Sequence, residues 1–205
     1  MRVTICTANC VGQAGNCSYP NRVTVVTPEQ LQEAVKKDHV CAEFKGNYRS
    51  VENFIRSDVI VMDIDNDHTD EPTEWITPEK LEELFPNVEY LLAPSRHHLL
   101  DKEGKSARPR YHMYFPISEI TDAGRYANLK KAIRSVYSFF DGNALDVARF
   151  IFGAECDEVI YHDVWMMVDE EVDIFDIEEE DFDSDMSGGK STGPILEGSC
   201  NNTMS

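Results

Sequence analysis

Two carboxylates close a strongly apolar segment, VIVMDIDND, at residues 59–67. Side chains at positions i and i+2 of a strand point to the same face, so Asp63 and Asp65 are expected to project together. Two carboxylates this close repel each other unless a cation lies between them. Mg²⁺ or Mn²⁺, which prefer oxygen ligands, would remove that repulsion. The alternative is a strand that ends in a solvated turn formed by Asp65, Asn66 and Asp67.

A third acid, Asp146, lies in the segment NALDVARFIFG among apolar residues that are expected to be buried. An unpaired buried carboxylate is costly, which favours a role as the third ligand of a two-metal site. Such a site brings the phosphates of a nucleotide to an attacking hydroxyl and stabilises both the attacking and the leaving oxygen. The alternative is that Asp146 caps a short helix over VARFIFG.

Between these acids lies a basic segment, SRHHLLDKEGKSARPRYHMYFPI, at residues 95–117. Its lysines and arginines donate hydrogen bonds and cannot accept them, which suits phosphate. They are Arg96, Lys102, Lys105, Arg108 and Arg110. Arg110 and His112 alternate on one expected strand, so they face the same side, a candidate for the side of the carboxylates. The alternatives are a buried structural His112 and a solvated loop around Lys102 and Lys105.

Two interpretations are open for Arg149, for the pair His97 and His98, and for the cysteines. Arg149 follows Asp146 by one helical turn and either contacts phosphates or pairs with an acid. His97 and His98 are zinc ligands or, as the sequence favours, polar loop residues. The six cysteines have no compact framework spacing and no C-x-x-C pair, so reduced thiols are expected rather than a zinc site.

Apolar periodicity predicts helices that interleave with strands. Strands are expected at 2–6, 22–26, 58–65, 88–95, 108–117, 158–162 and 164–168, and helices from 27, at 50–57, from 77 and at 122–140. Thr-Pro-Glu at 27–29 and again at 77–79 is typical of a helix start. This order predicts an α/β or α+β domain. We expect one domain over residues 1–168 and an acidic, Ser/Gly-rich tail or linker over 169–205.

The net charge of −19 is unevenly distributed along the chain. Residues 169–185 hold eleven acids and no base, whereas residues 1–168 hold 26 acids against 18 bases. Whole-chain charge therefore does not exclude a nucleic-acid partner. The acidic run either mimics nucleic acid and competes for the basic segment, docks a partner, or serves as a solubilising linker. No apolar run is long enough to cross a membrane and no signal peptide is evident, so a soluble, cytoplasmic protein is expected.

Taken together, VIVMDIDND, RPRYHMYFPI and ALDVARFIFG resemble the three-motif signature of the archaeo-eukaryotic primase superfamily. Residues 1–165 are most similar to the primase-polymerase catalytic domains of bacterial mobile elements and phages, through SRHH, K-x-G-K and RPRYHMYFP. The resemblance implies an α/β (α+β) core with a modified RNA-recognition-like sheet plus an N-terminal αβ unit. It also implies that Asp63, Asp65 and Asp146 bind Mg²⁺ or Mn²⁺ and that His112 contacts the nucleotide. Ser95-Arg96-His97 is the other match to the small-x-His form of the second motif.

The function expected from this resemblance is a template-dependent DNA primase or polymerase, active in replication of a mobile element or phage. Its partners would be a single-stranded DNA template, a primer, dNTP or NTP substrates and a candidate replicative helicase. The expected nucleotide-binding residues are His112, Arg110, Ser95, Arg96, His97, Lys105 and Arg149, with Lys102 and Arg108 for nucleic acid. Two alternatives stay open: a catalytically silent replication or origin-binding module, and a D-x-D glycosyltransferase.

Overall fold

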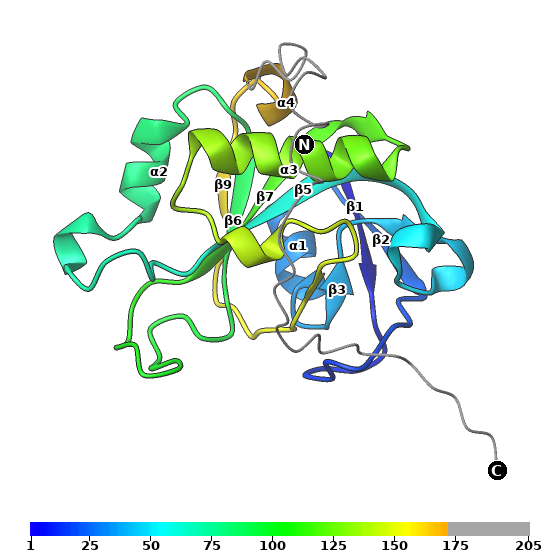
Figure 1. Ribbon diagram of the computed structural model, residues 1–205, viewed down its shortest axis with the longest axis horizontal. Coiled ribbons are helices and arrows are strands. Elements are labelled where there is room, and N and C mark those ends of the chain that lie inside the picture. The colour runs from blue at the N-terminus through cyan, green and yellow to red at the C-terminus, as the bar shows by residue number, and fades with distance from the viewer. Residues whose placement is uncertain (172–205) are drawn as a thin grey trace, which may run out of the picture.

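The computed structural model describes residues 1–171, in which helices and strands interleave along the chain (Figure 1). The strands are β1 (Val3–Thr7), β2 (Asn21–Val25), β3 (His39–Val40), β4 (Glu43–Phe44), β5 (Phe54–Ile64), β6 (Tyr90–Pro94), β7 (Tyr111–Ile120), β8 (Phe150–Ile151) and β9 (Ile160–His162). The helices are α1 (Pro28–Ala34), α2 (Pro78–Leu84), α3 (Ala123–Val136) and α4 (Val168–Glu171), with single 3₁₀ turns at Lys45–Asn47, Val51–Asn53, Pro72–Glu74 and Gly142–Ala144. The predicted α/β (α+β) class is confirmed.

The strands form two antiparallel sheets. The first has the order β2-β1-β3-β8 and the second β4-β5-β7-β6-β9. The longest pairing joins β5 to β7, and its register places Asp63 opposite His112 and Ile64 opposite Tyr111. Two of the predicted motifs therefore meet on neighbouring strands at one end of the second sheet.

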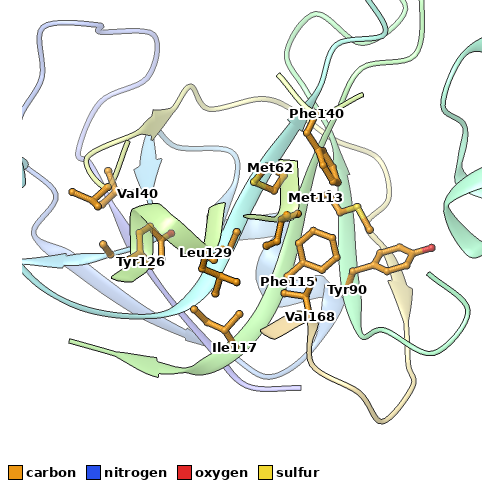
Figure 2. Packing of buried hydrophobic residues seen from close by; sticks show 14 of the residues in the cluster. Val40, Met62, Tyr90, Met113, Phe115, Ile117, Tyr126, Leu129, Phe140 and Val168 are labelled. Atoms are coloured by element: carbon orange, nitrogen blue, oxygen red, sulfur yellow. The ribbon is translucent and has the colours of Figure 1, made fainter. Parts of the chain in front are cut away.

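The buried core has two clusters, which lie on the two faces of β5 because its side chains alternate between those faces. Ile60 and Met62 belong to the cluster that includes residues of α2 and α3, and Figure 2 shows Met62 in this cluster with Leu129 of α3. Val59 and Val61 belong to a second cluster, which includes residues of α1. Because side chains alternate along a strand, Asp63 lies on the face of Val59 and Val61.

The predicted helix starts are confirmed at two threonines. The side chain of Thr27 accepts a hydrogen bond from Gln30 N at 3.4 Å, and that of Thr77 from Lys80 N at 3.5 Å. In each helix proline occupies the first position, where its missing N–H costs nothing.

Two predicted elements were wrong. Residues 50–57 are not a helix, because β5 begins at Phe54 and pairs there with Phe44 of β4. Residues 164–168 are not a strand, because Met166 makes an isolated bridge to Val88 and α4 begins at Val168. In both places a tertiary contact overrides the local apolar pattern.

Other predictions concern the ends and thiols of the chain. Most of the predicted tail, from residue 172 onward, lies outside the described residues. In the described part no helix is long and apolar enough to cross a membrane. The five cysteines within residues 1–171 are free thiols, as expected: Cys6, Cys10, Cys17, Cys41 and Cys156.

Candidate active site

Asp63 and Asp65 line one pocket of about 230 Å³ at the end of β5. Its other walls come from residues 95–97, from a hairpin at 102–103, from β7 and from residues 149–152. The full lining is Asp63, Asp65, Ser95, Arg96, His97, Lys102, Glu103, His112, Arg149, Phe150, Ile151 and Phe152. The structure thus brings together eight of the twelve residues that the sequence selected.

The carboxylate of Asp63 is buried and binds two side chains. Nδ1 of His112 lies 2.8 Å from Oδ1, and Nη2 of Arg149 lies 2.8 Å from Oδ2. Burial alone would raise the pKa of Asp63, but attraction to His112 and Arg149 holds that pKa well below its usual value. Asp63 is therefore an anion at neutral pH, and Arg149 takes the acid-pairing role that was one of its two predicted alternatives.

Asp65 is also placed between two cations. Nζ of Lys102 lies 2.7 Å from Oδ2, and Nε of Arg110 lies 3.8 Å from Oδ1. At 2.7 Å the Lys102 contact is a charge-assisted hydrogen bond, whereas the longer Arg110 contact is electrostatic only.

A tight hairpin positions Lys102. Lys102 N donates to Lys105 O at 3.1 Å and Lys105 N donates to Lys102 O at 2.9 Å. The two residues between them, Glu103 and Gly104, have φ of 51° and 79°, as in a type I′ turn. Gly104 adopts this conformation without strain, so the K-x-G-K segment is the local cause of the turn.

Residues 95–97 form another wall of the pocket. The guanidinium of Arg96 lies 3.8 Å from the ring centroid of Phe152, and its Nε is 3.2 Å from Nε2 of His97. Burial lowers the pKa of His97, and the charge of Arg96 lowers it further. A neutral His97 can accept the hydrogen bond that Arg96 donates. Phe152, which the sequence analysis did not single out, fixes the plane of Arg96.

Three of the predicted basic residues are absent from the pocket lining: Lys105, Arg108 and Arg110. Arg108 is fully buried and donates to Asn66 O at 2.9 Å and to Asp70 Oδ1 at 2.9 Å, so it fastens the loop that follows β5. Its predicted contact with nucleic acid is corrected to this structural role. Lys105 is not in the pocket lining, and its Nζ lies 3.8 Å from Asp70 Oδ1.

Arg110 is also fully buried and is absent from the pocket lining. Its Nη1 donates to His97 O at 3.1 Å and to Leu100 O at 2.8 Å. The predicted phosphate contact is corrected, because the guanidinium is covered and holds the 97–100 loop beside Asp65. The prediction that Arg110 and His112 share the carboxylate side is consistent with their contacts to Asp65 and Asp63.

Asp146 does not join the other two acids. It is exposed, and its Oδ1 accepts a hydrogen bond from Ala148 N at 2.9 Å, within its own turn. Among residues 1–171 no group of three or more His, Cys, Asp or Glu side chains is arranged to hold a metal ion. The predicted three-acid cluster is therefore not formed, and Asp146 has the local capping role that was its alternative, in a turn rather than a helix.

Another acid, Asp141, lies against the end of β5, and the sequence analysis missed it. Asp141 N donates to Asp63 O at 2.9 Å, and Asp141 lines a second pocket together with Asp65 and Lys102. The available signal was its position directly after Phe139-Phe140, since an acid that follows an apolar run also marks VIVMDID.

The number of carboxylate ligands in the pocket decides whether it suits a divalent metal ion. Two carboxylates on one pocket wall are too few for a cation held by protein ligands alone. Mg²⁺, however, is usually bound through one or two carboxylates together with substrate phosphates. Asp63 and Asp65 therefore fit a dication that arrives with a polyphosphate ligand.

Fold and site together define an α+β protein with a pocket that has two carboxylates on one wall and cations around them. No protein-family model and no curated protein matches the chain. Among solved structures it is similar to the AEP domain of the cyanophage S-2L primase-polymerase, at 11% identity and a TM-score of 0.42. That likeness covers 80% of this chain and 81% of the other. It does not establish a family at these values.

Proposed function

We propose that the protein is a nucleotidyltransferase, a template-dependent DNA primase-polymerase. One observation carries the proposal: the carboxylates of Asp63, near the end of β5, and Asp65, directly after it, share a pocket with His112, Arg149 and Arg96. A nucleoside triphosphate with a bound dication carries charges of both signs, and the pocket offers partners for both. The resemblance of the three sequence motifs to primase-polymerases supports the same reaction.

Asp63 and Asp65 would hold Mg²⁺ or Mn²⁺. The metal would neutralise the triphosphate and favour ionisation of the primer 3′-hydroxyl. Asp63 suits this role because its carboxylate is ionised at neutral pH. Asp141 lines the second pocket together with Asp65.

The basic residues would bind the phosphates. His112 faces Asp63 through Nδ1, which leaves Nε2 as the ring nitrogen that would contact a phosphate oxygen. Arg96 is held in plane against Phe152, so binding a phosphate costs it little rotamer freedom. Arg149 reaches the same pocket from the segment before β8.

The setting proposed for this reaction is replication of a mobile element or phage, with single-stranded DNA as template and a replicative helicase as candidate partner. The support is the similarity of SRHH, K-x-G-K and RPRYHMYFP to that branch of the superfamily.

Primer extension and de novo priming on single-stranded DNA test the proposal directly. The protein is incubated with template, dNTPs or NTPs and Mg²⁺ or Mn²⁺, beside the variants Asp63→Asn and Asp65→Asn. We expect product from the wild type and a loss of at least about 100-fold in each variant, the scale expected when transition-state charge is left unstabilised. Asp146→Asn is the matched carboxylate control. Equal product from wild type and Asp63→Asn would overturn the proposal.

A second candidate function is a catalytically silent replication or origin-binding module. The observation that favours it is the absence, within the described residues, of a group of three metal-binding side chains. Such a module would bind single-stranded DNA equally with and without metal and would yield no product. Metal-dependent synthesis that requires Asp63 would exclude it.

A further inference from the structure

Each carboxylate of the pocket has one inner and one outer partner. Asp63 binds His112, whose side chain is 16% exposed, and Arg149, which is 35% exposed. Asp65 lies beside Arg110, which is 0% exposed, and binds Lys102, which is 24% exposed. The pattern is the same at both acids: the side chain of the inner partner is less exposed than that of the outer partner, which is a cation.

The inner partners are fixed by the fold. His112 stands opposite Asp63 in the register of β5 and β7, which fixes the backbone positions of the pair. Arg110 directly precedes β7 and is tied to two carbonyl oxygens of the 97–100 loop. Arg110 cannot turn away from Asp65 without giving up these two hydrogen bonds in a buried position.

The outer partners are long side chains that line the pocket. Lys102 comes from the type I′ hairpin and Arg149 from the segment just before β8. Both can rotate away from their acids without moving a strand. Lys102 also separates two pockets, because Asp65, Lys102 and Glu103 line both of them.

We propose that Lys102 and Arg149 are exchangeable counterions, which stand at the two carboxylates until a metal-complexed polyphosphate replaces them. The dication would then take Asp63 and Asp65, while Lys102 and Arg149 would turn to the phosphate oxygens. The ligand class rests on the proposed function, but the exchange is a property of this chain's own ion pairs.

The charges explain why metal and polyphosphate should bind together. A dication alone would displace two cations and leave them unpaired in a half-buried pocket. A polyphosphate alone would draw the same cations away and leave two neighbouring carboxylates to repel each other. When both enter, every charge has a partner. Binding of one should therefore strengthen binding of the other, by a factor within the usual coupling range of about 5 to 150.

Mn²⁺ binding measured by electron paramagnetic resonance tests the exchange without any assay of activity. The wild type is compared with Lys102→Met and with Lys105→Met, which removes the same charge from the same hairpin outside the pocket lining. We expect Lys102→Met to bind Mn²⁺ alone about tenfold more tightly than the wild type, and Lys105→Met to bind as the wild type does. Equal affinity in all three proteins, or an equal gain in both variants, would overturn the inference.

The second arm uses inorganic tripolyphosphate as the probe. The wild type should bind the preformed Mn²⁺ complex at least about fivefold more tightly than tripolyphosphate alone, and Lys102→Met should show a smaller ratio. Equal binding of both forms by the wild type would contradict the exchange. Thermal melts check folding, and Arg149→Gln repeats both arms at the other carboxylate if Lys102→Met does not fold.

The results separate this inference from the proposed function. If the wild type extends primers but Lys102→Met gains no Mn²⁺ affinity, the function stands and the exchange is wrong. If no product forms under any condition but the variants show the expected changes, the exchange stands and the polymerase proposal fails.

Discussion

His112 lies directly opposite Asp63 in the pairing of β5 with β7, and its Nδ1 is 2.8 Å from Oδ1 of Asp63. A slip of one residue in this register would turn Asp63 toward the core face now filled by Met62 and Ile64. Burial of the apolar residues on β5 therefore also fixes the distance between the two polar residues. The site is built into the most extensive strand pairing of the molecule.

The first prediction concerns the two nitrogens of His112. Asn at this position keeps a donor near Nδ1 for Asp63 but offers nothing at Nε2. We expect His112→Asn to fold with nearly wild-type stability and to lose about 100-fold in nucleotide incorporation, because only the phosphate contact is missing. Thermal melts and primer extension measure the two effects. Full activity in His112→Asn would show that Nε2 contacts no phosphate.

The second prediction compares two acids five residues apart. Both side chains accept a backbone hydrogen bond within their own turn, but Asp141 also donates its N–H to Asp63 O and lines the second pocket with Asp65. We expect Asp141→Asn to reduce primer extension at least about tenfold through loss of negative charge near the metal, and Asp146→Asn to change it by less than about twofold. The reverse order would restore the assignment made from sequence.

The third prediction concerns pH and the buried His39. Its Nδ1 lies 2.8 Å from Lys37 O and its Nε2 lies 2.8 Å from the Tyr114 hydroxyl, so the ring donates to the carbonyl and accepts from the phenol. Burial lowers the pKa of His39 from 6.5 to about 4. The folded pKa lies below the unfolded one, so the unfolded chain binds the extra proton and stability falls as pH drops through this window.

The expected slope from His39 is about 1.4 kcal/mol per pH unit between pH 6.5 and 4. Denaturant unfolding at half-unit pH intervals measures it, beside His39→Gln, which does not titrate. The variant should lose most of this slope. It should still lose stability below pH 4, because the lowered pKa of Asp63 contributes acid sensitivity there. An unchanged slope in His39→Gln would mean that another group titrates there.

The fourth prediction concerns Asp38, which is fully buried and joins three segments. Its carboxylate accepts hydrogen bonds from Gly12 N at 2.9 Å, Gln13 N at 3.0 Å and Gly153 N at 2.8 Å. Gly153 directly follows Phe152 of the pocket wall. Asp38→Asn turns one acceptor into a donor that faces backbone N–H groups. We expect a loss of about 2–3 kcal/mol in the free energy of unfolding, measured with urea. A loss below about 0.5 kcal/mol would contradict the role of Asp38 as a junction.

Local patterns determined several features from the sequence alone. The period of two along VIVMDID places Asp63 and Asp65 on one face, and Thr-Pro-Glu marks the starts of α1 and α2. Each of these depends on residues within about four positions of one another, where backbone geometry leaves few alternatives. The mixed α/β class followed from the order of such elements.

The tertiary structure decided which charges meet. Asp63 bonds to His112 and Arg149, which are 49 and 86 residues away, and no local period encodes either contact. Arg110 has the sequence character of a phosphate ligand but is covered in the fold, while one backbone hydrogen bond brings Asp141 beside the end of β5. Judged by residue type alone, a charged side chain is equally suited to face solvent, to bind a ligand or to pair with a buried counterion. The choice depends on burial and on the counterion that strand pairing brings within about 3 Å.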